Sequence, residues 1–197
     1  KNSDLYKNSD IGLLTPEVKE AGLDMIPTSS TINQLSIGDA LAISTLKKKK
    51  INNLDFKKFH PSGSLGEKLK TAEDLMLTRD KIPFIDENKL MTKALKIMTE
   101  KKLGTLIVRN KKKYTTGIIT DGQIRRFNSK NINLNSLKVK DVMTKDPIKI
   151  DKNILATKAL AIMNEKKITS LCVYEKEKRF ITIGILHIHN ILNKKIY

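Results

Sequence analysis

Four consecutive hydroxyl-bearing residues at positions 28–31 form the first group of side chains in the chain that could bind a ligand. They lie at the N-terminus of a predicted helix at residues 30–48. A helix N-terminus carries unpaired N–H groups and the positive end of the helix dipole, so hydroxyls there can cap the helix or hold an anion. Capping is the commoner meaning of such a cluster, although one hydroxyl would be enough for it.

Two further side chains are suited to proton transfer, the carboxylate of Glu20 and the imidazole of His60. Carboxylate and imidazole can act as acid and base near neutral pH. Taken alone, a glutamate after Lys19 indicates a solvated face, and a histidine before Pro61 indicates a loop. These two residues therefore need further support before they predict catalysis.

The sequence predicts no metal site, because its three histidines and its single cysteine, Cys172, lack metal-ligand spacing. His187 and His189 alternate along a predicted strand end, so we expect their rings to face opposite sides. A single cysteine excludes an intrachain disulfide and favours the cytoplasm.

The composition is strongly basic, with 38 basic and 21 acidic residues and a net charge of +17. Only five of the basic residues are arginines, the lysines are scattered along the chain, and Trp is absent. Nucleic-acid-binding proteins tend to cluster their charge and to interleave arginine with aromatic residues. We therefore expect no nucleic-acid partner. No membrane partner is expected either, because no apolar run approaches the ~20 residues of a membrane span.

An internal repeat organises most of the chain. Corresponding segments lie 65 to 67 residues apart: 74–76 and 141–143, 92–95 and 157–160, 98–102 and 163–167, and 117–119 and 184–186. Each copy predicts a strand, a helix, two strands and a final helix. The strands are expected at 82–85, 106–108 and 116–119, and at 148–150, 171–174 and 180–186. Two units of this length are expected to pack together and share a core.

The duplicated β-α-β-β-α order resembles the CBS domain pair over residues 71–193. The motifs Asp-Leu-Met, Asp-Val-Met-Thr and Gly-Ile-Ile-Thr-Asp-Gly support the resemblance. It implies a cleft for adenine nucleotides or related effectors, with six candidate contacts: Gly117, Thr120, Gln123, Gly184, His187 and Asn190. Two of these, Gln123 and Asn190, stand where the family carries a ribose-binding aspartate, so weak nucleotide binding is expected. The pair can equally be a structural and oligomerising module.

Residues 1–70 lie outside the repeat. They predict a strand at 11–14, a loop, and the helix at 30–48. Apolar residues lie nearly all round this helix, so we expect it to be buried on more than one side.

Four motifs in this first part resemble the arabinose 5-phosphate isomerase family: Lys19-Glu20-Ala21, 27–31, 38–42 and 60–66. Ser62 replaces a glycine that is usual in the family, and the loop between Glu20 and Pro27 is about one residue short. The resemblance implies an α/β fold. Residues 1–66 are then the C-terminal part of a sugar isomerase (SIS) domain, a doubly wound parallel α/β domain, followed by CBS repeats at 71–128 and 137–197.

The same resemblance implies interconversion of D-ribulose 5-phosphate and D-arabinose 5-phosphate, on the route to the lipopolysaccharide sugar Kdo. Glu20 then takes part in proton transfer at carbon, and His60 in ring opening or in proton movement at oxygen. Thr28, Ser29 and Ser30 contact the substrate, with no cofactor and no metal. A homotetramer with a nucleotide or CMP-sugar effector is expected.

The family's phosphate-binding loops have no counterpart in these 197 residues, so we expect the chain alone to be inactive. One alternative is a stand-alone CBS regulatory module that binds a nucleotide or nucleotide sugar. Another is a sibling SIS isomerase for a different phosphosugar, or a transcription regulator with an SIS domain.

Overall fold

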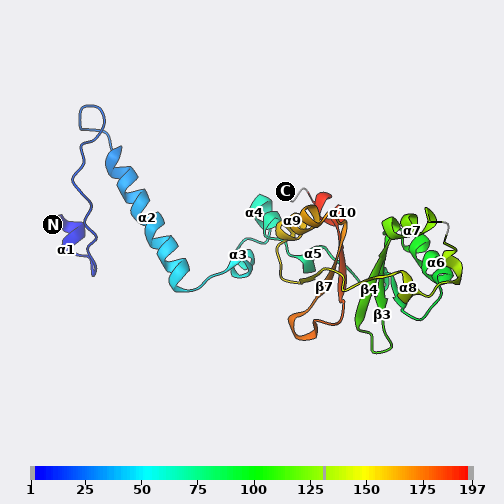
Figure 1. The fold of residues 1–197 in the computed structure, drawn as a ribbon. Coiled ribbons are helices and arrows are strands. Elements are labelled where there is room, and N and C mark those ends of the chain that lie inside the picture. Colours follow the sequence, from blue (N-terminus) through cyan, green and yellow to red (C-terminus); the bar gives the residue numbers. More distant parts are fainter. Residues whose placement is uncertain (1–2, 131, 195–197) are drawn as a thin grey trace. The chain divides into compact units, whose positions relative to one another are not determined.

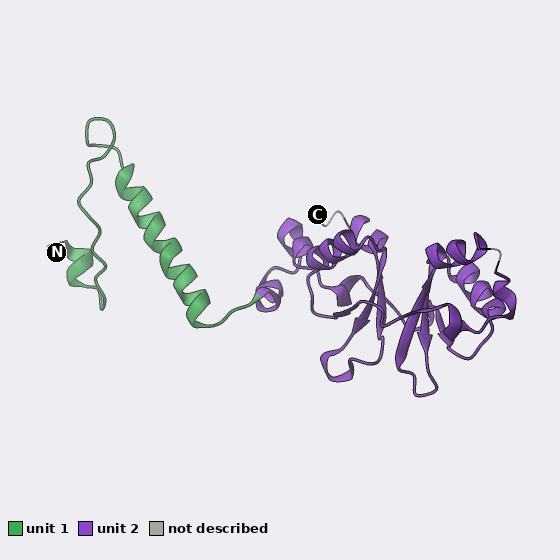
Figure 2. Ribbon diagram, in the orientation of Figure 1, with its two compact units in different colours: residues 1–52 green, residues 53–197 purple. Residues whose placement is uncertain are grey.

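The computed structural model describes residues 3–130 and 132–194. The chain divides into two compact units, residues 1–52 and residues 53–197 (Figure 2).

The described part of the first unit contains two helices, α1 (Asp4–Lys7) and α2 (Ser29–Lys48). Helix α2 confirms the predicted helix, starting one residue earlier. The strand predicted at 11–14 is wrong, because that stretch has no regular structure. A strand needs hydrogen bonds from a neighbouring strand, and the described part of this unit contains no strand at all.

No described residue of the first unit is buried. The apolar side chains of α2 are exposed, including Ile32 at 64% and Leu35 at 66%. The expected burial of α2 on more than one side is therefore not met within this unit, because no described sheet or helix of the unit covers it.

The second unit begins with two short helices, α3 (Asn53–Phe59) and α4 (Gly63–Lys68). Two four-stranded sheets follow, with strand orders β2-β3-β4-β5 and β1-β8-β7-β6. The first sheet contains β2 (Phe84–Asp86), β3 (Thr105–Arg109), β4 (Thr115–Thr120) and β5 (Thr144–Lys145). The second contains β1 (Leu77–Thr78), β8 (Gly184–His187), β7 (Ser170–Tyr174) and β6 (Lys149–Asp151).

Each sheet contains three strands from one copy of the repeat and one short strand from the other copy. Strand β1 lies near the start of the first copy but pairs antiparallel with β8 of the second, and β5 lies near the start of the second copy but pairs antiparallel with β4 of the first. Within each sheet a parallel pair, β2–β3 or β6–β7, comes from one copy, as the β-α-β order requires. The two halves are therefore linked by backbone hydrogen bonds between paired strands.

Helices cover the sheets (Figure 1). In the half with β2–β5 these are α6 (Met91–Lys101), α7 (Asp121–Asn128) and α8 (Val139–Val142). In the other half they are α5 (Ala72–Leu75), α9 (Ala156–Lys166) and α10 (Ile188–Leu192). Three 3-10 turns, η1 (Arg79–Lys81), η2 (Leu134–Ser136) and η3 (Lys176–Lys178), complete the unit. This element order confirms the expected duplicated β-α-β-β-α fold. Among the described residues, no helix combines the length and apolar character that a membrane crossing requires.

Each half has its own apolar core, and a third cluster joins them. This joint cluster holds Ile82 and Ile107 from the first copy, and Cys172 and Ile185 from the second. Buried hydroxyl pairs also cross between the copies: Thr105 Oγ1 lies 3.1 Å from Ser170 Oγ, and Thr115 Oγ1 lies 2.7 Å from Thr182 Oγ1. The copies thus share a core, as their length predicts.

Candidate functional site

A cavity of about 720 Å³ lies between the two copies of the repeat. Equivalent positions from both copies line it. Lys102 and Lys167 end α6 and α9 in the left-handed conformation, with φ of 54° and 53°. Thr120 and His187 precede α7 and α10. The cavity wall therefore repeats the internal symmetry of the sequence.

Basic groups outnumber acidic groups around this cavity. Four cationic side chains line it, against the carboxylates of Asp121 and Asp146; the cations are Lys102, Arg125, Arg126 and Lys167. The N-terminus of α7, which begins at Asp121, also meets the cavity. This charge pattern and the volume suit an anionic ligand of nucleotide size.

Gln123 lines the cavity but is buried, with 7% of its surface exposed. Its Oε1 accepts a hydrogen bond from the Thr120 backbone amide at 2.9 Å, which caps α7. Its Nε2 donates to Thr144 Oγ1 at 2.6 Å and to the Val142 carbonyl at 3.3 Å. The amide thus ties α7 to the β5 segment, a role in which its two N–H donors are used.

His187 and Asn190 form the corresponding cap in the second copy. Asn190 Oδ1 accepts from the His187 backbone amide at 3.1 Å. His187 lines the cavity, whereas Asn190 does not. Burial, together with the nearby His189, lowers the pKa of His187.

The expectation that His187 and His189 face opposite sides is wrong. Both rings line the cavity, with centroids 5.1 Å apart. Strand β8 ends at His187 and α10 begins at the next residue, so the alternation of a strand stops before it reaches His189. Among the described residues, no group of three or more His, Cys, Asp or Glu is placed to hold a metal ion.

Gly117 and Gly184 lie outside the cavity lining. A Cβ at Gly117 would come within 2.5 Å of Met143 Sδ, and one at Gly184 within 2.2 Å of Met76 Sδ. Both glycines thus leave room for a methionine that precedes the exchanged short strand. This close contact explains why both copies carry a glycine at this position of the repeated motif.

Glu20 in the first unit lies at the N-terminus of α2. Its carboxylate accepts hydrogen bonds from the Thr28 backbone amide at 2.6 Å, the Thr28 hydroxyl at 2.8 Å and the Ser30 backbone amide at 3.2 Å. Hydrogen bonds from Ser30 and Thr28 lower the pKa of Glu20 to about 2. The structure therefore brings together three of the sequence-predicted site residues, and Ser29 begins the helix between them.

His60 lies in the second unit, between α3 and α4. Its ring stacks on Phe56 with centroids 4.3 Å apart, and its Nδ1 lies 3.2 Å from the Phe56 carbonyl oxygen. Helix α3 thus sets the orientation of the imidazole.

Sequence reasoning missed the four cations of the cavity wall. Lys102 and Lys167 close a repeated segment, 98–102 and 163–167, so their equivalence was visible in the sequence. Arg125 and Arg126 have no arginine counterpart in the second copy, and only the tertiary structure places them at the cavity.

The family model described as CBS domain matches residues 72–130 and 139–196. An uncharacterized protein of Rickettsia prowazekii (strain Madrid E) is 38% identical over 193 residues, covering 98% of this chain and 59% of that protein. Arabinose 5-phosphate isomerase KdsD of Escherichia coli (strain K12) is 36% identical over 192 residues, covering 96% of this chain and 58% of the isomerase. This chain thus spans less than two thirds of the length of either relative.

A crystal structure of CBSX2 in complex with AMP, a CBS-pair protein from Arabidopsis thaliana, has the same fold as the second unit. It aligns with a TM-score of 0.56 at 22% identity, covering 64% of this chain and 96% of that protein.

Proposed function

Because this chain belongs to the CBS domain family and resembles an isomerase well beyond its CBS repeats, we propose that the protein containing it is an arabinose 5-phosphate isomerase. The supporting observation is the extent of the similarity to the Escherichia coli isomerase, which covers 96% of the chain. A shared CBS pair alone would account only for residues 72–130 and 139–196. The isomerase activity belongs to the longer protein, since this chain covers 58% of that relative.

The proposed reaction interconverts D-ribulose 5-phosphate and D-arabinose 5-phosphate for Kdo and lipopolysaccharide synthesis. We assign residues 1–66 to the end of an SIS domain, and 71–128 and 137–197 to the CBS repeats. The protein acts in the cytoplasm as a homotetramer. Cys172 is the only cysteine of the sequence and can form no intrachain disulfide, which suits a compartment without disulfide chemistry.

Glu20 and His60 carry the proposed chemistry. A base removes a proton from the carbon next to the carbonyl, an enediol forms, and the proton returns at the neighbouring carbon. A carboxylate with a pKa near 2 is a weak base, so Glu20 has to exchange some of its contacts with Thr28 and Ser30 when substrate binds. Thr28, Ser29 and Ser30 then offer hydroxyls and amides to the sugar phosphate, and His60 moves protons at oxygen.

The cavity between the repeats is the proposed effector site of the enzyme, for a nucleotide such as AMP or for a CMP-sugar. Its excess of cations and its volume of about 720 Å³ support this assignment. Thr120, Gln123 and His187 line it, whereas Gly117, Gly184 and Asn190 act by shaping the elements behind it.

The activity is tested with the full-length protein and D-ribulose 5-phosphate. Glu20→Gln is expected to reduce turnover at least about a hundredfold, with Glu17→Gln as the matched control. Turnover of the Glu20 variant within about threefold of the unmodified enzyme, a difference under ~1 kcal/mol, would exclude Glu20 from proton transfer.

A stand-alone CBS regulatory module is the second candidate function. Its support is that the second unit contains both repeats and the complete cavity. Nucleotide binding by a full-length protein that does not isomerise pentose phosphates would favour this candidate.

A further inference from the structure

The segment that carries His60 is held in place by several contacts. The His60 backbone amide donates to the carbonyls of Phe56 and Lys57 at 3.2 and 3.1 Å, and the ring stacks on Phe56. Helix α4 packs closely on the other side. A Cβ at the buried Gly66 would lie 2.8 Å from the His60 carbonyl oxygen.

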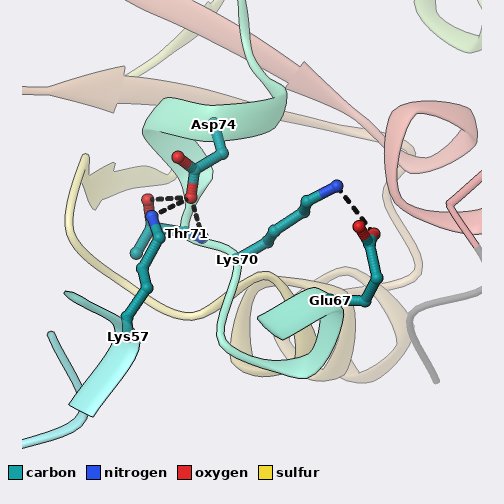
Figure 3. A network of polar contacts seen from close by, with 5 residues as sticks. All are labelled: Lys57, Glu67, Lys70, Thr71 and Asp74. Atoms are coloured by element: carbon teal, nitrogen blue, oxygen red, sulfur yellow. Dashed lines mark hydrogen bonds and ion pairs between the residues drawn. The ribbon is translucent and has the colours of Figure 1, made fainter. Parts of the chain in front are cut away.

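One ion pair ties this segment to the CBS pair. The ammonium group of Lys57 on α3 pairs with the carboxylate of Asp74 on α5 (Figure 3). The same carboxylate accepts hydrogen bonds from the Thr71 amide at 2.7 Å and the Thr71 hydroxyl at 2.9 Å. Partial burial opposes ionisation of Asp74, but hydrogen bonds from Lys57 and Thr71 outweigh it and lower the pKa of the carboxyl.

Helix α5 is itself fixed to the CBS pair by a backbone hydrogen bond and by core packing. The Ala72 amide donates to the Ile154 carbonyl at 2.8 Å, and Ala72 and Leu75 belong to the core of the half that contains β6–β8. Beside it, Lys70 pairs with Glu67 of α4 at 2.7 Å (Figure 3). Of the two helices that flank His60, α3 is thus joined by a side chain to the polar contacts at the start of α5.

We propose that Lys57 is a positioning residue, which holds His60 on the CBS pair through its ion pair with Asp74. The inference rests on the proposed function for the importance of His60. Proton transfer needs a group within hydrogen-bond reach of its target, so a small displacement of the imidazole is costly to the rate. Lys57 lies on α3, outside the apolar cores of the repeats, and the side chains of Lys57 and Asp74 are 29% and 32% exposed. Loss of the ion pair should therefore move His60 without unfolding the repeats.

The placement of His60 is measured by NMR on the 197-residue chain, which has only three histidines. Lys57→Met removes the charge but keeps the length of the side chain. Lys58→Met is the matched control, because Lys58 is 73% exposed and pairs with Asp55 on α3 itself, at 3.1 Å. We expect the His60 ring resonances to shift in Lys57→Met, through altered stacking on Phe56, and to stay unchanged in Lys58→Met and Lys57→Arg. Equal His60 spectra in both methionine variants would overturn the inference.

Kinetics of the full-length enzyme separate this inference from the proposed function. Lys57→Met should lower kcat roughly tenfold with KM nearly unchanged, because Lys57 positions His60 without touching substrate. Lys57→Arg should restore kcat. If His60→Gln leaves kcat unchanged, the catalytic role of His60 is refuted. The NMR result alone then shows whether Lys57 positions the His60 ring. If His60→Gln is inactive while Lys57→Met matches Lys58→Met, the positioning role is refuted.

Discussion

His187 Nδ1 accepts a hydrogen bond from the His189 backbone amide at 3.3 Å, which turns both imidazoles toward one cavity. Lys167 and Asp146 line the same cavity. Two imidazoles therefore line the space in which an anionic effector is proposed to bind.

Nucleotide binding should take up protons at His187. Burial and His189 lower its pKa from the usual 6.5, so the folded chain binds fewer protons there than the unfolded chain. This contribution to stability is therefore complete above pH 6.5 and decreases as the pH falls from 6.5 to the folded pKa. A bound phosphate favours the charged imidazole, so from roughly pH 7.5 to 6 the AMP affinity should rise about threefold relative to that of a His187→Asn variant.

Calorimetry in buffers of different ionisation enthalpy measures that proton uptake. His187→Asn keeps an acceptor for the His189 amide but cannot titrate, and the phosphate of AMP titrates equally in both proteins. Equal proton uptake by the variant and the unmodified chain would contradict the assignment.

Binding of AMP or CMP-type ligands should be weak and sensitive to salt. Neither Gln123 nor Asn190 offers the charged acceptor that would hold a ribose, so attraction of phosphate by the cavity cations dominates. We expect Lys167→Gln to weaken binding roughly threefold and to reduce its salt dependence. Lys176→Gln, in η3 and outside the cavity lining, should change neither. Calorimetry at two salt concentrations measures both effects, and submicromolar binding unaffected by salt would refute the expectation.

Gln123→Asp should bind nucleotide more tightly but fold less stably. A carboxylate can accept hydrogen bonds from the ribose hydroxyls, which is expected to improve affinity roughly tenfold. The variant also loses the donors to Thr144 and the Val142 carbonyl, which should cost about 1–3 kcal/mol in the free energy of unfolding.

Asn190→Asp is the matched control for this substitution, since only the acceptor Oδ1 of Asn190 has a described protein contact. Its stability should change by less than about 0.5 kcal/mol in denaturant unfolding. A Gln123→Asp variant as stable as Asn190→Asp would show that the donor contacts of Gln123 contribute little.

Limited proteolysis should cut residues 1–52 before the repeats. No described residue there is buried, and residues 9–28 between α1 and α2 contain no helix or strand. Residues 71–193 should melt as one cooperative unit, because backbone pairs β1–β8 and β4–β5 link the two copies. Mass spectrometry of early fragments identifies the sites. First cuts within the repeats, with residues 1–52 intact, would contradict the expectation.

The order of elements was already determined by the sequence itself. Helix α2 and the duplicated β-α-β-β-α order follow from local periodicity and from repeated segments 65 to 67 residues apart. Such patterns show which residues share one face of one element, and the prediction is stronger because the same pattern occurs in both copies.

Tertiary packing determined which segments contact one another, which those patterns do not specify. The strand predicted at 11–14 has no partner strand among the described residues of its unit, His189 lies with α10 beside His187, and Lys57 contacts Asp74, 17 residues along the chain. The exchange of β1 and β5 between the sheets likewise joins segments far apart in sequence. Contacts of this kind depend on how whole elements dock on one another. The free energy that favours them comes from burial and strand pairing between distant segments, and the hydrophobic pattern within each segment is the same whichever partner it meets.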